Sequence, residues 1–321
     1  GDPPKASLKD RMGKSLTIAT ARLPSSVRPQ STTLRALPEG QTIHELFDFD
    51  EEIHHGGDRG KVILARRRGD NMDVVVKIRT KCPNTASDRS WRAIMSQMHS
   101  LGGKSHVLDI LDIIEGSNEY YVVMPRCKGG ELFDFLATEA EIPETECKRI
   151  IREILTAAGH LHKNNLIHRD IKPENIMFDM GGRTEASPRT VKLIDFDTCL
   201  EWTPMSPKSS CFVGTPGYIA PEALIGQSSP QSDLWSIGVI LYILMTGEMP
   251  WTNLVSLEDG VVGSPGALHM YSAIRAEVLD WDQDPWTQFP LARDLGQKLL
   301  AFRTSDRLQS VEAALSHPWL A

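Results

Sequence analysis

The sequence predicts an α+β protein with two lobes, a small strand-rich one followed by a larger, mainly helical one. Three observations lead to this prediction. The 321 residues, 40% hydrophobic and 24% charged, suffice for two packed units of an ordinary globular protein. Short strand-like runs dominate from Glu45 to about Tyr121, and the pattern turns mainly helical after Gly129-Gly130.

Residues 1–40 precede these elements and differ from them in composition. They are rich in Ser, Thr, Pro and basic residues, and they contain few aromatic residues. Such a segment has little apolar surface to bury, so we expect a flexible, loosely ordered extension. The remaining residues, 41–321, are predicted to form one domain whose lobes span about 41–127 and 128–321.

The strands of the small lobe are expected at four runs of apolar and β-branched residues, 62–66, 74–79, 108–115 and 120–124. One helical stretch interrupts them, because apolar side chains recur at helical spacing at Trp91, Ile94, Met95, Met98 and Leu101. Ser90 precedes this run and can cap it. The small lobe should therefore be a sheet that carries one helix.

Helices of the large lobe are expected at residues 132–137, 144–161, 233–246, 267–276, 291–300 and 311–316. The longest apolar run, Trp235–Leu244, is too short to span a bilayer and is interrupted by Ser236 and Gly238. It is better explained as a buried core helix, so no membrane segment is predicted. Loops are expected at 180–189 and 254–267.

Charge and cysteine content limit the classes of partner and compartment. The net charge of −7 does not favour binding to nucleic acid or to an anionic membrane. Five scattered cysteines, with no CxxC pair, stand at positions 82, 127, 147, 199 and 211. This usage favours free thiols in a reducing, cytoplasmic compartment over disulfides or a zinc site.

The segment HRDIKPENIMF at 168–178 is the strongest chemical signal in the chain. It places Asp170, Lys172 and Asn175 in one short loop between a helix and a strand. A carboxylate can accept a proton from an attacking hydroxyl, and a nearby lysine can neutralise a phosphoryl group in transfer. A carboxamide oxygen can bind Mg²⁺. A polar loop without chemistry would not require these residue types in this order.

Two weaker signals lie in the small lobe. Lys77 ends the apolar strand VVVKI, and HHGGDRGKV at 54–62 supplies Gly57 and Gly60 one strand earlier. Alone, such a lysine is usually solvated and such glycines usually mark plain turns. Together they favour a phosphate site, because glycines allow backbone N–H groups to approach phosphate oxygens. A third segment, VKLIDFDTC at 191–199, ends a buried-looking strand in Asp195 and Asp197.

Across about Phe47–Leu320 the chain resembles the protein kinase family, through GGDRG (56–60), Lys77, HRDIKPEN, DFD (195–197), GTPGYIAPE (214–222), SDLWSIGV (232–239) and Arg307. GGELFD (129–134) and HPWL resemble the calcium/calmodulin-dependent group, and within it the calcium-dependent protein kinases of plants and protists. The resemblance implies the bilobal kinase fold, ATP and Mg²⁺ as cofactors, and protein substrates with exposed Ser or Thr. No DxDxDG-type loop is present, so a calcium-sensing module would lie outside this chain.

The resemblance also assigns roles by position. Asp170 would deprotonate the substrate hydroxyl, Lys172 would stabilise the γ-phosphoryl charge, and Thr215 would bond both. Asn175 and Asp195 would hold Mg²⁺. The ATP-binding positions would be His55, Gly57, Gly60, Val62, Val75, Lys77, Met124, Pro125, Cys127, Glu131, Glu174 and Met177. The structural positions would be Arg169, Phe196, Glu222, Asp233 and Arg307.

Glu131 and Glu174 also match acids that receive a substrate arginine in this family. The resemblance therefore implies a basophilic enzyme with an Arg-x-x-Ser/Thr preference. At the usual activation-loop phosphothreonine stands Cys211, beside Ser209 and Ser210. We therefore expect activity that does not strictly require phosphorylation of this loop.

Three departures from the family pattern leave a second function open. His55 replaces the first glycine of the phosphate loop, and Asp197 replaces the glycine of DFG. No Asp or Glu lies between Asp88 and Asp109, so the expected helix glutamate falls near the apolar Ile94 or Met95. The alternative to a serine/threonine kinase is thus a pseudokinase, a module that binds nucleotide or serves as a scaffold. Asp197 is expected to bond neighbouring backbone amides or, as an auxiliary ligand, to reach the metal through water.

Overall fold

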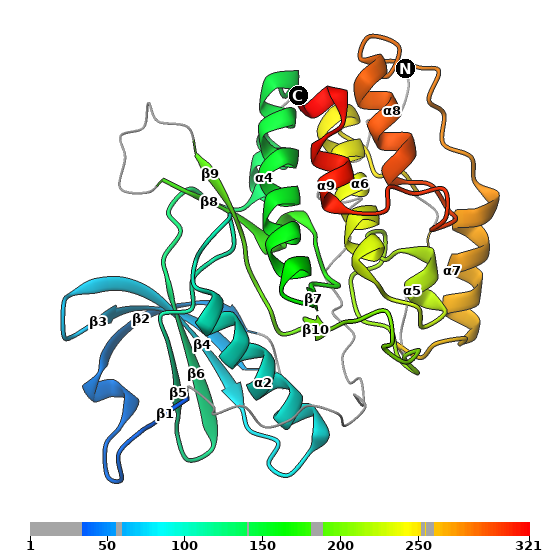
Figure 1. Ribbon diagram of the computed structural model, residues 1–321. Coiled ribbons are helices and arrows are strands. Elements are labelled where there is room, and N and C mark those ends of the chain that lie inside the picture. Colours follow the sequence, from blue (N-terminus) through cyan, green and yellow to red (C-terminus); the bar gives the residue numbers. More distant parts are fainter. Residues whose placement is uncertain (1–33, 56–59, 140, 181–188, 252–253, 255–259) are drawn as a thin grey trace, which may run out of the picture. The chain divides into compact units, whose positions relative to one another are not determined.

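The structure, a computed structural model, describes residues 34–55, 60–139, 141–180, 189–251, 254 and 260–321. The predicted α+β class is confirmed: one unit contains the main sheet and the other contains most helices (Figure 1). The two compact units meet in the sequence between Lys128 and Gly129. Among the described residues, no helix has the length and apolar content needed to cross a bilayer.

The first unit contains a six-stranded sheet in the order β1-β5-β6-β4-β3-β2. Its strands are β1 (Arg35–Ala36), β2 (Phe47–His55), β3 (Lys61–Arg67), β4 (Met72–Thr80), β5 (Asp112–Glu115) and β6 (Glu119–Pro125). A short 3-10 helix, η1 (Ile43–Glu45), precedes β2. Strands β3, β4 and β6 match predicted runs, whereas β5 begins four residues later than the predicted run at 108. Strand β2 was not predicted.

Strand β1 corrects the predicted boundary of the N-terminal extension. Residues 34–40 were expected to be loosely ordered, but β1 pairs in parallel with β5. Arg35 forms an ion pair with Asp112 at 2.7 Å, and the Leu37 N–H donates to the Glu115 carbonyl at 2.9 Å. Leu37 also packs against the core. Composition alone missed this strand because its stability depends on an edge of a distant sheet.

Alternation along the strands divides the sheet into two faces. One face holds a hydrophobic cluster made of Ile43, Phe47, Ala65, Val74, Val76, Ile114, Tyr121 and Val123. Val75 and Lys77 alternate with Val74 and Val76, so they lie on the opposite face. One face of the sheet therefore packs in the hydrophobic cluster, and the opposite face carries the predicted site residues Val75 and Lys77.

Helix α2 (Ala86–Leu101) is the one helix predicted for this unit. Its N-cap is Thr85, whose hydroxyl accepts from the Asp88 N–H at 3.1 Å, whereas Ser90 lies inside the helix. The prediction of Ser90 as the cap is therefore wrong: the helix extends one turn further back, over residues without apolar periodicity. The Tyr120 hydroxyl donates to the buried Asp88 carboxylate at 2.9 Å and ties the helix to the sheet.

The second unit is mainly helical, as predicted. Its α-helices are α3 (Leu132–Thr138), α4 (Glu144–Lys163), α5 (Pro221–Leu224), α6 (Pro230–Thr246), α7 (Pro265–Ala276), α8 (Pro290–Leu299) and α9 (Val311–Leu315). Helices α6, α7 and α8 begin earlier than expected because a proline occupies the first turn, where its missing N–H costs nothing. Among the α-helices in the described part of this unit, the one-turn α5 alone was not predicted.

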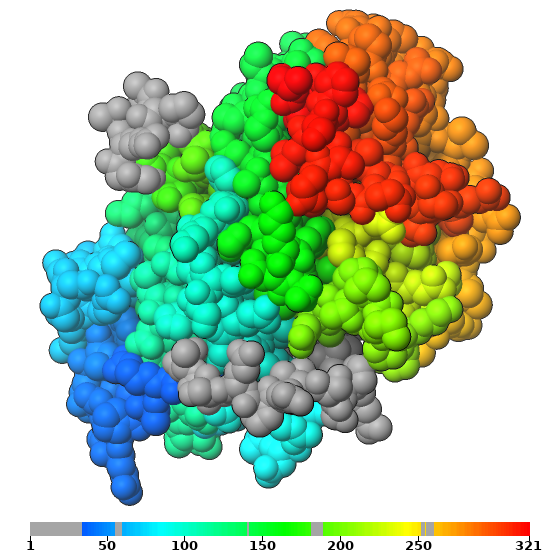
Figure 2. All heavy atoms as spheres, in the orientation of Figure 1, coloured from blue at the N-terminus to red at the C-terminus, as the bar shows by residue number. Residues whose placement is uncertain are grey.

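Helix α6 forms the centre of this unit, and its residues from Ser232 to Leu244 are all buried. Helix α4 packs against both α6 and α9. In Figure 2 the red C-terminal segment, which includes α9 and the 3-10 helix η4 (Pro318–Leu320), lies against green α4. The apolar run Trp235–Leu244 is thus a core helix, as the sequence indicated.

Two short two-stranded sheets complete the second unit and carry the loops of the candidate site. Strand β7 (Leu166–Ile167) pairs with β10 (Leu200–Glu201), and β8 (Ile176–Asp179) pairs with β9 (Thr190–Leu193). The 3-10 helix η3 (Pro173–Asn175) connects β7 to β8. The segment 168–175 is therefore held at both ends by strand pairing.

Candidate active site

Four predicted side chains converge in the loop between β7 and β8. The Thr215 hydroxyl donates to Asp170 Oδ1 at 2.8 Å, and Lys172 Nζ donates to the Thr215 hydroxyl at 2.8 Å. Lys172 Nζ also lies 3.4 Å from Asp170 Oδ2. Asn175 Nδ2 donates to the carbonyl oxygen and to Oδ2 of Asp170, at 2.8 and 3.1 Å. Asp170 and Lys172 are each only 3% exposed, so the carboxylate is fixed in orientation.

Asp233, at the start of α6, anchors the backbone of this loop. Its two carboxylate oxygens accept from the N–H groups of His168 and Arg169, both at 2.9 Å. His162, on α4, approaches Asp233 Oδ2 at 2.8 Å through Nε2. Burial would raise the pKa of Asp233, but the hydrogen bond with His162 and the nearby histidines outweigh it, and the pKa is lowered. Asp233 thus holds the backbone of this loop through two hydrogen bonds, and sequence reasoning did not identify its partner His162.

Arg169 and Phe196 also have structural positions. Arg169 adopts a left-handed backbone with φ of 70°, which a non-glycine residue keeps only when its surroundings hold it. Its Nε donates to the Thr198 carbonyl at 2.6 Å, and burial lowers the pKa of its guanidinium to about 10. Phe196 is buried and its ring meets that of His168 edge to face, with centroids 6.1 Å apart.

The DFD segment shows why its third residue need not be glycine. Asp195 has a positive φ of 62°, whereas Asp197 is not among the described residues with positive φ. The Asp197 N–H donates to Asp195 Oδ1 at 3.4 Å. The backbone at Asp197 is therefore not in the left-handed region, so this conformation does not require glycine there. What the Asp197 side chain does stays a prediction.

Asn175 and Asp195 fit a Mg²⁺ ion. The Ile194 N–H donates to the Asn175 carbonyl at 2.9 Å, which brings the start of the DFD segment beside Asn175. The Asn175 carboxamide donates both of its hydrogen bonds to Asp170 through Nδ2, and its Oδ1 is the kind of oxygen that Mg²⁺ prefers. The described residues contain no group of three or more acidic, His or Cys side chains placed to hold a metal. Mg²⁺ would therefore complete its six oxygen ligands with nucleotide phosphates and water.

Glu131 and Glu174 form an acidic subsite in the same unit. Glu131 occupies the N-cap of α3 without a capping hydrogen bond from its side chain, and its backbone bridges to Met177 on β8. Burial raises the pKa of Glu131, and the charges of Asp134 and Glu174 raise it further. Burial likewise raises the pKa of Glu174. A raised pKa means that the charged form of each carboxylate is less stable here than in water. A cationic ligand beside these carboxylates would stabilise that charged form.

Two polar atoms beside this subsite have no partner among the described residues. They are Glu174 Oε2 and the hydroxyl of Tyr218, and both are buried. Burial raises the pKa of Tyr218 strongly, with added effects from Glu174 and Asp170. Sequence reasoning did not single out Tyr218, although it lies within the quoted segment GTPGYIAPE. Buried groups of this kind normally have a hydrogen-bond partner, which water or a ligand can supply.

In the first unit, strand register gathers predicted nucleotide-contacting residues on one face of the sheet. Val62 pairs with Lys77 across β3 and β4, and Val75 pairs with Met124 across β4 and β6. Directly paired residues share a face, so these four side chains lie opposite the hydrophobic cluster. Pro125 ends β6, and Cys127 follows it within the unit.

The glycine segment is described only in part. His55 is the last residue of β2, and Gly57 lies outside the described residues. Gly60 has a φ of 111°, and a Cβ there would lie 1.7 Å from the Ile78 carbonyl oxygen. This contact with the neighbouring strand already requires glycine at position 60, whatever approach to phosphate it also permits.

Helix α2 has no acidic side chain at the position expected for the family glutamate. Ile94 and Met95 are 7% and 2% exposed and belong to the core of the unit. The single acid of the helix, Asp88, lies near its N-terminus and is engaged by Tyr120. The folded helix therefore has buried apolar side chains where the family pattern has a glutamate.

A buried ion pair supports the second unit away from the catalytic loop. Arg307 donates to Glu222 through Nη1 and Nη2 at 2.7 and 3.0 Å, and its side chain is fully buried. The Ser232 hydroxyl donates to Glu222 Oε1 at 2.8 Å. This arrangement ties α5 to α6 and to the segment before α9.

Comparison with known proteins agrees with this geometry. A family model described as the protein kinase domain matches residues 50–320. The chain is 34% identical over 287 residues to CDPK-related kinase 4 of Arabidopsis thaliana. This alignment covers 88% of this chain and 46% of that protein. The chain is 33% identical over 307 residues to calcium-dependent protein kinase SK5 of Glycine max, covering 92% of this chain and 56% of that protein. The chain thus spans about half the length of these curated relatives.

Proposed function

Since the chain belongs to the protein kinase family, we propose that it transfers the γ-phosphoryl group of ATP to serine or threonine hydroxyls of protein substrates, with Mg²⁺ as cofactor. The observation that carries this proposal is the buried network that joins Asp170, Thr215 and Lys172. A module that only bound nucleotide would not need a lysine and a threonine to orient one carboxylate.

The geometry suggests how these residues share the reaction. Thr215 donates to one oxygen of Asp170, which holds the carboxylate in place to accept the proton of a substrate hydroxyl. Lys172 places a positive charge 3.4 Å from that carboxylate and can neutralise charge on the phosphoryl group in transfer. Asn175 and Asp195 would hold Mg²⁺, which supplies further neutralisation of phosphate charge when bound. Lys77 would contact the α- and β-phosphates.

The acidic subsite supports a preference for arginine three residues before the acceptor. A guanidinium has five donors in a planar fork, and Glu131, Glu174 and the Tyr218 hydroxyl offer acceptors for it. Both carboxylates are half-buried, so their charge is screened less than that of surface acids. This subsite therefore favours a basophilic kinase.

Replacing both acids, Glu131→Gln with Glu174→Gln, should lower kcat/KM for a peptide with Arg at minus three. The expected loss is about 10- to 100-fold, since a hydrogen bond to a charged group contributes roughly 1.5–3 kcal/mol. A peptide with Ala at minus three should change little. Steady-state assays on both peptides measure the effect, and Glu139→Gln, at the exposed end of α3, is the matched control. Unchanged discrimination in the double variant would refute the subsite.

The same subsite gives an expected pH dependence. Because the pKa values of Glu131 and Glu174 are raised, these acids become neutral at a higher pH than ordinary glutamates. The preference for Arg over Ala at minus three should therefore decline, as pH falls, before exposed carboxylates titrate. The ratio of kcat/KM values for the two peptides across the mildly acidic range reports this decline.

A pseudokinase is the second candidate, and the apolar Ile94 and Met95 favour it. A kinase should be stabilised by ATP with Mg²⁺ and should transfer labelled phosphate to a peptide. Ligand at about 100 times its Kd adds roughly 2.7 kcal/mol of stability, a shift that thermal melting detects. Stabilisation without transfer, under conditions where a related active kinase transfers label, would establish the pseudokinase. Transfer that Asp170→Asn abolishes would exclude it.

Calcium control and compartment complete the proposal. Relatives bear the name calcium-dependent protein kinase, and the chain covers only about half of their length. We therefore place any calcium-sensing module outside residues 1–321. None of the five cysteines, all of which lie in the described residues, forms a disulfide, which supports a reducing, cytoplasmic location.

A further inference from the structure

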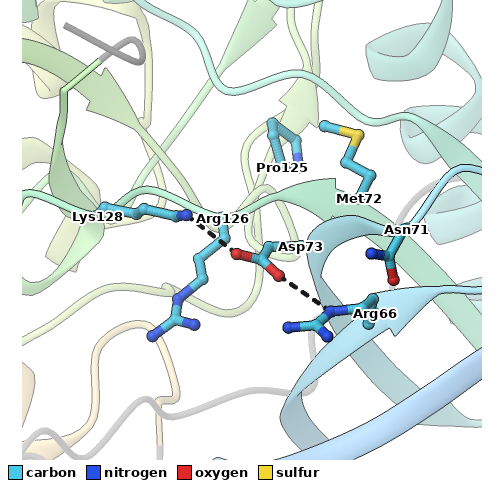
Figure 3. Close-up of a pocket in the computed structure, with 7 residues that line it drawn as sticks. All are labelled: Arg66, Asn71, Met72, Asp73, Pro125, Arg126 and Lys128. Carbon is cyan, nitrogen blue, oxygen red and sulfur yellow. Dashed lines mark hydrogen bonds and ion pairs between the residues drawn. The ribbon is translucent and has the colours of Figure 1, made fainter.

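A pocket of about 430 Å³ lies on the first unit and is built on three adjacent strands (Figure 3). It is lined by Arg66, Asn71, Met72, Asp73, Pro125, Arg126 and Lys128. Arg66 and Asp73 are direct cross-strand partners on β3 and β4, and Val74 pairs with Pro125 on β6. The strand ladder therefore fixes the backbone of Arg66, Met72, Asp73 and Pro125, and Arg126 and Lys128 follow directly after β6.

The pocket is cationic in a chain whose net charge is −7. Three of its side chains are cations, Arg66, Arg126 and Lys128, and Asp73 is its one carboxylate. Lys128 lies 3.0 Å and Arg66 lies 3.5 Å from Asp73. The hydrogen bond and charge of Lys128, with the charge of Arg66, lower the pKa of Asp73, so this acid stays ionised. The lining thus carries a net charge of +2.

Arg126 is the cation that has no internal role. It is exposed, and it forms no hydrogen bond or ion pair with any residue that the structure describes. In Figure 3 the guanidinium groups of Arg66 and Arg126 both lie below the Asp73 carboxylate, whereas Met72 and Pro125 lie above it. Two guanidinium groups in the same part of the pocket offer donors suited to one polyvalent anion.

We propose that this pocket binds a phosphoserine or phosphothreonine side chain on a segment of a partner protein. A phosphorylated side chain carries about −1.5 to −2 charges at pH 7, which matches the net +2 of the lining, whereas a carboxylate neutralises only half of it. Asp73 already supplies a carboxylate to Arg66 and Lys128. Arg126 is then the primary contact, with Arg66 beside it, because guanidinium groups bind phosphate in bidentate fashion.

The occupant is a partner rather than the N-terminal segment of this chain. Residues 1–33 contain six basic and two acidic residues, a net charge of +4 that the cationic pocket would repel. The pocket is wide open to solvent, so a phosphorylated side chain can enter while its backbone stays outside. This binding does not depend on phosphoryl transfer by Asp170.

Fluorescence polarisation with a labelled phosphoserine peptide flanked by Gly and Ser tests the proposal. The double variant Arg66→Ala with Arg126→Ala should weaken binding at least about tenfold, given roughly 1.5–3 kcal/mol per charge-assisted contact. The control Arg68→Ala removes an exposed arginine that pairs with Asp48, outside the pocket, and should bind as the parent does. Melting curves verify that each variant is folded.

Three further probes sharpen the outcome. Inorganic phosphate should compete with the peptide, and the unphosphorylated peptide should bind at least about tenfold more weakly, as expected for a dianion. Equal affinity for a peptide with Glu in place of phosphoserine would overturn the phosphate assignment. Binding to phosphatidylserine vesicles without binding to the phosphopeptide, or equal losses in the double variant and in Arg68→Ala, would overturn the site.

Discussion

Asp170→Asn is expected to reduce phosphoryl transfer to peptide by about 10²- to 10⁴-fold, the usual contribution of a positioned general base. Asparagine keeps the shape of the side chain and can still accept the hydrogen bond from Thr215, but it cannot take the proton of a substrate hydroxyl. ATP-induced stabilisation should change little, because Asp170 is assigned no contact with the nucleotide. Radiolabelled transfer and thermal melting, run on the same samples, separate the two effects.

The control for this experiment is an aspartate of the same unit that lies away from the loop. Asp282→Asn removes an exposed carboxylate that pairs with Arg293 at 3.0 Å, and it should retain parental activity. If Asp170→Asn kept more than half of the parental rate, Asp170 would not be the base. In that case the buried network with Lys172 and Thr215 would have a structural role only.

Arg307→Met should lower the free energy of unfolding by about 3–5 kcal/mol, because it leaves the Glu222 carboxylate buried without its cation. Glu222→Gln should also destabilise, and the double variant should recover part of the loss, since no uncompensated charge then remains. Urea unfolding measures the effect as a lower midpoint with an unchanged slope.

An exposed ion pair with a similar N–O distance provides the comparison. Lys298 and Asp294 lie 2.8 Å apart on α8, with side chains 48% and 46% exposed. Lys298→Met should cost less than about 1 kcal/mol, since solvent screens such pairs. A loss in Arg307→Met no larger than in Lys298→Met would show that burial of the Glu222–Arg307 pair has no energetic consequence.

Much of the fold follows from local patterns in the sequence. Helices α3, α4 and α6 lie where the apolar spacing predicted them, and strands β3, β4 and β6 match runs of β-branched residues. These predictions hold because each element buries a face that its own sequence defines. Local patterns do not predict an element that is stabilised by a distant part of the chain. Strand β1 is such an element, because it depends on pairing with the edge of β5.

The candidate site divides in the same way. The sequence alone identified Asp170, Lys172 and Asn175 as candidate catalytic residues, because one loop of eight residues contains them all. The hydroxyl of Thr215 reaches that loop from 45 residues away, and only its family resemblance predicted the contact that the structure contains. His162 and Tyr218 gave no usable signal, because each acts through a partner distant in the sequence.

The sequence by itself determined the fold class, the order of the elements and the residues of the catalytic loop, since these depend on hydrophobic period and on neighbours along the chain. Tertiary structure decided which distant groups complete each local unit. It selected Thr85 as the cap of α2, the contact with Ile78 that requires glycine at position 60, and the cations that surround Asp73. The physical reason is that strand pairing and helix packing, which no local window contains, determine where these side chains meet.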